Sequence, residues 1–310
     1  MTGMVRLKNN QNRLKRGTVN AFILVMLLGI SFVILFPFLV KLSSAFMSRS
    51  DLMDKTVKHI PRNPTLDNIK LVWDSTGFLR ALLNTAGISL MCGLLQMFTS
   101  SLIGYGLAKF KFKGRGLLFA IVIGLMIIPP QAILISMFMK FKFFDIFGVL
   151  GLLLGKPVNL IDTVWPMVIL SGTGLGFKNG LYIFLMRQFY RNVPDELIEA
   201  AYIDGSGVYR TFLTVILPLS KPTMITIFLL AFSWQWTDTF YSSVIFTKIG
   251  VLSNVVANIA SKAMFETNQA QYASVYTNTA ALMIIVPLIL LYVFAQRYFV
   301  QGIERSGITG

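Results

Sequence analysis

Long apolar runs separated by short polar segments dominate this chain. A helix of roughly 20 apolar residues crosses a hydrocarbon core of about 30 Å. Six runs reach that length, at residues 19–46, 81–108, 117–139, 166–190, 222–247 and 277–299. The run from Ala81 to Ala108 is the clearest, because it carries no charged residue. The pattern therefore predicts an all-α membrane protein with six transmembrane helices.

The third run has a break signal near its middle, where Pro129 and Pro130 are adjacent. Paired prolines remove two helix hydrogen bonds and force a break, and in lipid the freed groups need neighbouring helices or a water-filled cavity. A static kink and a hinge or pathway-lining element both remain open. The fourth run has glycines four residues apart, which predicts a helical stripe that a neighbouring backbone approaches closely. These glycines are Gly172, Gly176 and Gly180.

Composition agrees with a membrane protein and restricts the chemistry. Of 310 residues 55% are hydrophobic and only 13% are charged, which is too apolar for an ordinary soluble domain. The net charge of +15 does not indicate nucleic-acid binding, because Lys and Arg sit mainly between the apolar runs. Their positions favour cytoplasmic amino and carboxyl termini by the positive-inside rule. One cysteine, Cys92, and one histidine, His59, exclude a zinc cluster and make a Cys–His nucleophile implausible, so we expect neither a metal nor a catalytic residue.

The same pattern divides the chain into four parts. We expect a basic cytoplasmic tail at 1–18, which lies against anionic headgroups, and a first transmembrane helix with an outer loop at 19–76. A helical core follows at 77–303, and a second cytoplasmic tail occupies 304–310. Within the core, a polar segment at about 192–218 interrupts the apolar runs on the cytoplasmic side.

This polar segment carries the start and stop signals of two short helices. Pro194 fits the first turn of a helix, and the two acidic residues after it suit the positive end of the helix dipole. Gly205 and Gly207 end that helix and permit a sharp turn. Ser206 is expected to cap a second helix that runs to Pro218. Such a device has little use in lipid, so we expect another protein to hold it.

The residues of this segment resemble the signature loop of inner-membrane permeases of binding-protein-dependent ABC importers. The motif is Glu199-Ala200-Ala201-x-x-Asp204-Gly205, followed by Leu217-Pro218 and Pro222. Upstream, Leu185-Met186-Arg187-Gln188-Phe189-Tyr190 is similar to the carbohydrate-uptake branch, which includes the smaller maltose-type permease subunit. The resemblance covers about residues 70–303 and implies a type I permease fold for the core.

In that family the loop docks into a cleft on a cytoplasmic ATPase, and ATP-driven closure of two ATPases switches a permease pair from inward- to outward-facing. The resemblance implies a coupling role for Glu199, Ala200, Ala201, Asp204, Gly205, Leu217 and Pro218. An amphipathic interfacial turn without a docking role is the alternative.

The resemblance also implies the partners. They are a second homologous permease in a pseudo-symmetric heterodimer, two ABC ATPases that bind ATP and Mg, and an extracytoplasmic sugar-binding protein. The chain itself would hold no cofactor and would not be an enzyme. It would lie in a bacterial inner membrane and translocate a sugar or oligosaccharide.

Candidate substrate-pathway residues lie mainly in the fifth run. Aromatic rings stack on the C–H faces of sugars, while sugar hydroxyls need polar partners. The candidates are Asn84, Lys178, Trp234, Trp236, Asp238 and Tyr241. The family often has Asn where this chain has Thr237, which weakens any residue-level transfer. An interfacial aromatic belt is the alternative.

Lys178 and Asp238 are ionisable residues in or near apolar runs, where a charge costs about 2.5–3.5 kcal/mol on insertion scales. Three explanations remain open: the two residues pair, Lys178 contacts an acidic sugar, or both lie at headgroup level. For the whole chain, the alternative function is a secondary transporter or channel subunit. That function would require a complete pathway and usually longer repeats or intramembrane ion sites, which the sequence does not offer.

Overall fold

A computed structural model describes residues 2–146, 148–267 and 270–307 of the chain. Every regular element in these residues is helical. The chain divides into two compact units. Unit 1 comprises Met1–Val72 and Lys262–Leu282, and unit 2 comprises Trp73–Ser261 and Met283–Gly310.

Unit 1 is built around α1 (Thr2–Ala45), whose part from Arg16 to Ala45 is long and apolar enough to span a membrane. This confirms an apolar helix over the first predicted run, although no helix boundary separates it from the expected tail at 1–18. The outer segment holds α2 (Arg49–Met53) and the start of α3 (Asp67–Thr76). Residue 1 of the first tail and residues 308–310 of the second lie outside the described residues.

The buried Asp51 of α2 organises the outer segment of unit 1. Its carboxylate accepts hydrogen bonds from the backbone N–H of Asn63 at 2.9 Å and from the Asn63 amide at 3.2 Å. Asn68 donates to the carbonyls of Ala45 and Met47 at 3.1 and 2.8 Å. These bonds tie the segment to the end of α1, which gives a loop without apolar runs a fixed shape.

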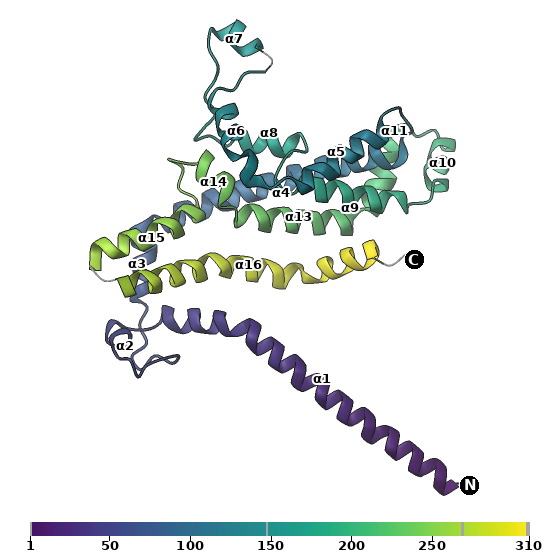
Figure 1. Cartoon of the computed structure of the whole chain (residues 1–310). Helices are drawn as coiled ribbons and strands as arrows, with labels where there is room; N and C mark the ends of the chain where they lie inside the picture. The colour runs from purple at the N-terminus through teal and green to yellow at the C-terminus, as the bar shows by residue number, and fades with distance from the viewer. Residues whose placement is uncertain (1, 147, 268–269, 308–310) are drawn as a thin grey trace. The chain divides into compact units, whose positions relative to one another are not determined.

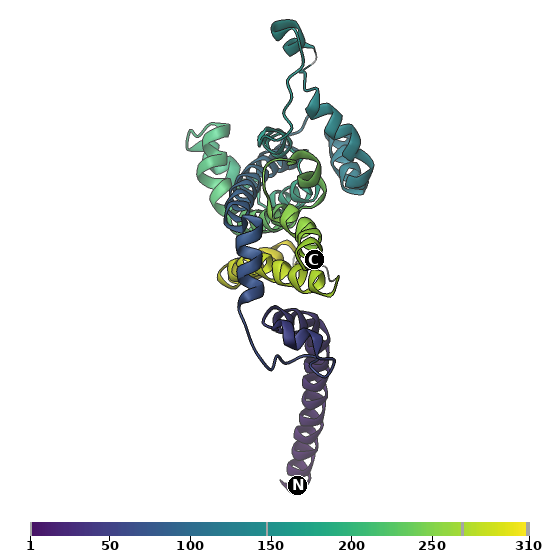
Figure 2. The same cartoon turned by 90° about the vertical axis from the view of Figure 1, so that its left-hand side faces the viewer.

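Unit 2 is a helical bundle with α4 (Phe78–Lys109) at its centre. α4 packs against α8 (Trp165–Gly172), α9 (Asn179–Arg191) and α13 (Lys221–Trp236) (Figures 1 and 2). It is the second helix that meets the length and composition of a membrane span, and this confirms the clearest predicted run. A third lies within α16 (Ala270–Gly307), from Tyr272 to Gln296, and confirms the sixth run.

The packing of α4 on α9 is close enough to require glycine. A Cβ atom added at Gly104 would lie 2.6 Å from the Cβ of Met186 and 2.9 Å from the backbone nitrogen of Arg187. The second of these atoms is backbone and cannot rotate away. Gly104 therefore sets the distance between the two helices.

The third run is broken at the predicted place. α5 (Arg115–Ile127) and α6 (Pro130–Lys142) meet at an angle of 103°. Ile128 and Pro129 are both extended, with ψ values of 119° and 134°, because a residue before proline avoids helical geometry. Pro130 is at the first helical position, where a missing N–H costs nothing. The break is a sharp corner in the run, well beyond a mild kink.

The fourth run is not one helix, and the prediction of a glycine stripe there is wrong. α8 ends at Gly172, Gly174 has φ +79°, and Lys178 has φ +63° before α9 begins. Glycine weakens a helix and fits left-handed positions, so this cluster ends a helix instead of lining one. At Gly180 a neighbouring backbone does approach closely, because an added Cβ would lie 2.9 Å from the Val122 carbonyl oxygen. At Gly174 and Gly176 an added Cβ would instead meet side chains, the nearest at 2.8 Å.

The fifth run also stops early, because α13 ends at Trp236 and the separate α14 (Phe240–Ile245) follows. The predicted single helix over 222–247 is therefore wrong. Among the described residues, three helices have the length and apolarity of a span, and five do if each bent pair counts as one. The predicted count of six stays a prediction.

After α6, unit 2 has a projecting loop with α7 (Val149–Leu154) at its tip (Figures 1 and 2). Phe144 and Val158 close its base through an antiparallel bridge. Asp162 fixes it to the segment between α14 and α15 (Leu252–Thr267), because its carboxylate accepts from the backbone N–H groups of Thr247 and Lys248 at 2.6 and 2.7 Å. Burial alone would raise the pKa of Asp162, but these hydrogen bonds outweigh it and lower the pKa.

We expect Gly104→Ala to destabilise the protein, because overpacking a tight helix contact costs about 1–3 kcal/mol. The matched control is Gly106→Ala in the same helix, where an added Cβ meets nothing within 4 Å. That control should keep or slightly raise the melting temperature, because Ala favours a helix over Gly. Thermal unfolding of both variants in detergent tests this prediction, and equal melting temperatures would contradict it.

Candidate functional site

The polar segment at 192–218, called the hook below, folds as short helices. They are α10 (Glu196–Ile203), α11 (Val208–Thr211), a π-helical turn (Phe212–Ile216) and α12 (Leu217–Leu219). α10 and α11 lie together at one end of the unit 2 bundle, whereas α14 lies toward the other end (Figure 1). The two predicted helices of this segment therefore exist, and the second runs from Val208 to Leu219 with a π-helical turn inside it.

Gly205 makes the turn between the two parts of the hook. It has φ +79°, a left-handed conformation that side chains disfavour. The backbone N–H groups of Gly205 and Ser206 donate to the carbonyls of Tyr202 and Ala201, which satisfies the end of α10. The predicted capping role of Ser206 is wrong, because Gly207 occupies the N-cap position of α11 and no side chain caps it.

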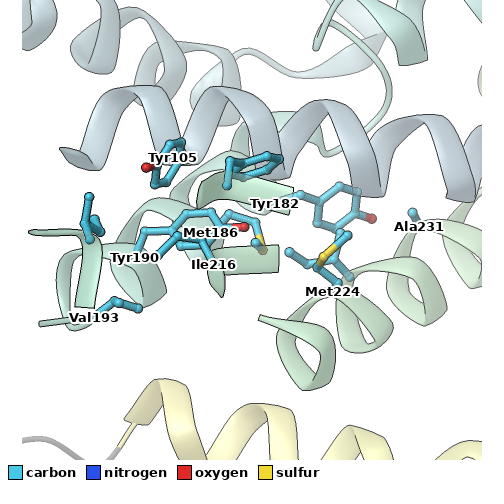
Figure 3. Close-up of a cluster of buried hydrophobic side chains, with 11 residues drawn as sticks. Tyr105, Tyr182, Met186, Tyr190, Val193, Ile216, Met224 and Ala231 are labelled. Carbon is cyan, nitrogen blue, oxygen red and sulfur yellow. The ribbon is translucent and has the colours of Figure 1, made fainter. Parts of the chain in front are cut away.

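Buried side chains fasten the hook to the bundle. Ile198, Phe212 and Ile216 from the hook lie in one cluster with aromatic residues of α4 and α9. The ring of Tyr105 on α4 lies 4.9 Å from that of Phe212 and 5.5 Å from that of Tyr190. Figure 3 draws the whole cluster, which consists of Tyr105, Tyr182, Met186, Tyr190, Val193, Ile198, Phe212, Ile216, Met224, Ile227 and Ala231.

A chain of hydroxyl groups runs through this apolar cluster. The Tyr190 hydroxyl lies 2.6 Å from Ser101 Oγ on α4 and donates to Ser220 Oγ at 3.2 Å. Ser220 in turn donates to the Leu217 carbonyl at 2.9 Å. Burying a polar group without a hydrogen-bond partner costs free energy. This series of hydroxyl groups therefore fixes α4, α9 and the end of the hook relative to one another.

Lys109, the last residue of α4, holds the start of the hook. Its ammonium group donates to the Asp195 carboxylate at 2.6 Å and to the Val193 carbonyl at 2.5 Å. The hydrogen bond from Lys109 and then its charge lower the pKa of Asp195. The pair therefore contributes fully above the ordinary pKa of 3.8 and is lost only as pH falls through the lowered value.

Opposite these anchors, the hook presents an exposed surface. Five of the seven coupling candidates are exposed: Glu199, Ala200, Asp204, Gly205 and Pro218. Ala201 faces inward with 8% exposure, and Leu217 is half-buried. Ile203 and Tyr209, which were not among the candidates, are 86% and 87% exposed. The hook therefore presents apolar and acidic side chains to its surroundings, while its other side is held against the bundle. Such a surface is suited to contact with another protein.

The candidate pathway residues separate into two groups. Lys178 and Tyr241 line a cleft of about 380 Å³ together with Pro129 and Pro130, where the α5–α6 corner faces the connection between α8 and α9. The ammonium group of Lys178 lies 5.0 Å from the centre of the Trp234 ring. Lys178 and Trp234 are thus brought together although 56 positions separate them in sequence.

Phe177 connects this group and was missed from the sequence. Its ring lies edge-on to the rings of Trp234 and Tyr241, at 5.6 and 5.5 Å. The Lys178 ammonium is also 5.4 Å from its ring centre. Its position next to a charged residue in an apolar run was the available signal.

The other three candidates have structural partners and do not line the cleft. Asp238 is buried and accepts from the backbone N–H groups of Phe240, Tyr241 and Ser242 at the start of α14. Trp236 is buried and donates to the Ile284 carbonyl at 3.1 Å. Asn84 donates to the Gly250 carbonyl at 2.9 Å. Within the described residues no ion pair joins Lys178 to Asp238, so that hypothesis is not confirmed.

A family model matches residues 100–305, which include the whole hook and the cleft. Its description is "Binding-protein-dependent transport system inner membrane component". Named relatives extend the similarity over most of the chain. An alpha-glucoside transport system permease, AglG of Rhizobium meliloti, is 28% identical over 81% of this chain, which spans 62% of that protein.

Two other relatives match over nearly their full length. The arabinooligosaccharides transport system permease AraQ of Halalkalibacterium halodurans is 27% identical, over 91% of this chain and 93% of the relative. The sn-glycerol-3-phosphate transport system permease UgpE of Yersinia pestis is 28% identical, over 94% and 98%.

Solved structures share the fold. A chain of a bacterial ABC transporter that imports the acidic polysaccharide alginate superposes with a TM-score of 0.70 at 22% identity, covering 91% of this chain and 96% of that one. A chain of the alginate transporter in complex with a pentasaccharide-bound periplasmic protein gives 0.61 at 15% identity, covering 90% and 95%. The predicted type I permease-like fold is confirmed.

We expect Tyr190→Phe to lower stability by about 1 kcal/mol or somewhat more, because it removes the hydroxyl that Ser101 and Ser220 contact. The matched control is Tyr182→Phe in the same helix, whose buried hydroxyl has no hydrogen-bond partner. Losing an unpaired buried hydroxyl should cost nothing. Chemical denaturation in detergent compares the two, and an equal loss in both variants would refute the role given to Tyr190.

Proposed function

The chain belongs to the binding-protein-dependent transport system inner membrane component family, and on that premise we propose that it moves a sugar or oligosaccharide as one permease subunit of an ATP-driven importer. Family membership makes it a transport component and not an enzyme. The alternative of a secondary transporter or channel subunit is set aside for the same reason.

A carbohydrate cargo has two lines of support. Relatives that match most of this chain are named for alpha-glucosides and arabinooligosaccharides. The cleft region also offers aromatic rings beside polar groups, with Phe177, Trp234 and Tyr241 in mutual contact and Lys178 among them. Sugars bind to such combinations because their C–H faces stack on rings while their hydroxyls bond to polar atoms.

The coupling role of the hook is supported by how it is mounted. A short helix is marginal alone in water, so α10 depends on its packing against the bundle. The buried cluster behind it and the Lys109–Asp195 bond join it to α4 and α9 at several points. A partner that pulled on the exposed face of Glu199 and Ala200 would therefore move the bundle instead of bending the loop. The proposal depends on one observation: the exposed residues of α10 belong to a segment whose other side is buried against α4 and α9.

The remaining parts of the importer are other chains. We infer a second homologous permease, two cytoplasmic ATPases that bind ATP and Mg, and an extracytoplasmic sugar-binding protein. The hook and both termini face the cytoplasm in this arrangement, which agrees with the basic residues near those membrane ends. Glu199, Ala200, Ala201, Asp204, Gly205, Leu217 and Pro218 would form the ATPase contact, and Ile203 and Tyr209 would extend it.

We expect Glu199→Lys to abolish most substrate-stimulated ATP hydrolysis and uptake, because it reverses a charge at the proposed contact. Insertion and yield should persist, since the side chain is exposed. Lys140→Glu is the matched control, an exposed charge reversal on α6 outside the hook. Affinity purification should recover an ATPase and a second permease with the wild type and with Lys140→Glu. Unchanged uptake in Glu199→Lys would defeat the coupling role.

A further inference from the structure

We propose that the cleft between the α5–α6 corner and the α8–α9 connection binds an anionic sugar, with Lys178 as the group that recognises its carboxylate. This inference rests on the proposed sugar transport and specifies the class of cargo. The first reason for it is the positive charge of Lys178. Among the described residues that line the cleft, Lys178 is the only charged one, and the rest are mainly apolar. Lys178 is an exposed residue, so its ammonium group is accessible to an anionic ligand that enters the cleft.

Among the described residues no carboxylate forms an ion pair with Lys178. The carboxylate of Asp238 accepts hydrogen bonds from the backbone N–H and the hydroxyl of Ser242. What the ammonium does contact is aromatic, the faces of Trp234 and Phe177 at 5.0 and 5.4 Å. Cation–π contact orients the group but leaves its charge and its three donor hydrogens available.

The backbone at Lys178 is itself unusual. Its φ of +63° is left-handed, which is uncommon for a residue with a side chain and marks positions held by the surrounding structure. The carbonyl of Lys178 accepts from the N–H groups of Leu181 and Tyr182, which begin α9. The side chain thus starts at the positive end of a helix of 13 residues, and both contributions favour an anion at the same place.

The walls of the cleft suit the rest of a sugar. Phe177 and Tyr241 offer ring surfaces, and Gly174 and Gly176 leave part of the wall without side chains. Behind Gly176 the wall is closed, because a Cβ atom added there would lie 2.8 Å from the side-chain oxygen of Asn179 and 2.9 Å from Gln96 Nε2. The volume of about 380 Å³ is at the lower end of the range of about 300–1,000 Å³ for ligand sites.

Equilibrium binding to the complete transporter in nanodiscs tests this directly. The probes are radiolabelled trigalacturonate and its carboxyl-reduced counterpart galactotriose, which differ only in their carboxylates, and the lipid is phosphatidylcholine. Trigalacturonate should bind at least tenfold more tightly than galactotriose. Lys178→Met should remove that difference, Lys178→Arg should keep it, and Lys140→Met, an exposed lysine outside the cleft, should leave it unchanged.

Three results would overturn the inference: no binding of trigalacturonate, equal binding of the two probes to the wild type, or a preference that survives in Lys178→Met. Loss of trigalacturonate binding on adding phosphatidylglycerol would assign Lys178 to lipid headgroups instead and would also overturn it. None of these results affects the proposed importer function, which fails separately if no ATPase copurifies or if Glu199→Lys leaves uptake unchanged.

Discussion

The burial of hook side chains against Tyr105 and Tyr190 is the contact on which the rest of the structure depends. The hook has too few residues for a core of its own, and a short helix gains most of its stability from packing. Phe212 and Ile216 supply that packing, because they lie in one buried cluster with residues of α4 and α9. At Gly104 the backbones of α4 and α9 also lie close together. We therefore expect the hook to move together with α4 and α9 and not independently of them.

This arrangement gives unit 2 a firm part and a broken part. The firm part is the packing of α4 against α9 and α13, with the hook at one end. The broken part contains the proline corner, the glycine-rich connection before α9 and the turn at Asp238, and the first two of these line the cleft. Irregular backbone at membrane depth is tolerated where it is buried in protein or lines a cavity. The breaks therefore mark the place where this bundle has room for a ligand.

The features predictable from the sequence were those with local signals. The uninterrupted run from Ala81 to Ala108, the corner at Pro129 and the turn at Gly205 each follow from a few adjacent residues. Glycine was harder to interpret, because the same spacing suits a packed stripe and a series of helix ends. Gly172 ends α8 and Gly176 lies in the connection before α9, and nothing nearby in the sequence distinguishes this arrangement from a packed stripe.

Only part of the candidate site could be predicted, because the sequence does not show which groups each side chain contacts. A hydropathy window counts charges but does not show where they are satisfied, so Asp238 was grouped with the pathway although it binds the backbone of α14. Lys109 was missed as the anchor of the hook because its partner Asp195 is 86 positions away. The position of Phe177 beside Lys178 was a weak signal, and its contacts with Trp234 and Tyr241 arise only in the folded chain.

Cysteine cross-linking at Ala200 is the most direct test of the claim that the hook carries work from a separate ATPase to the membrane. The side chain is exposed, and the native Cys92 is fully buried, so an A200C variant presents one accessible thiol. We expect a maleimide–benzophenone cross-linker attached to this thiol to join the position to the ATPase subunit when inside-out membrane vesicles are irradiated. We also expect protection from membrane-impermeant thiol reagents applied outside intact cells. Labelling from outside, or no cross-link to the ATPase in the assembled complex, would contradict it.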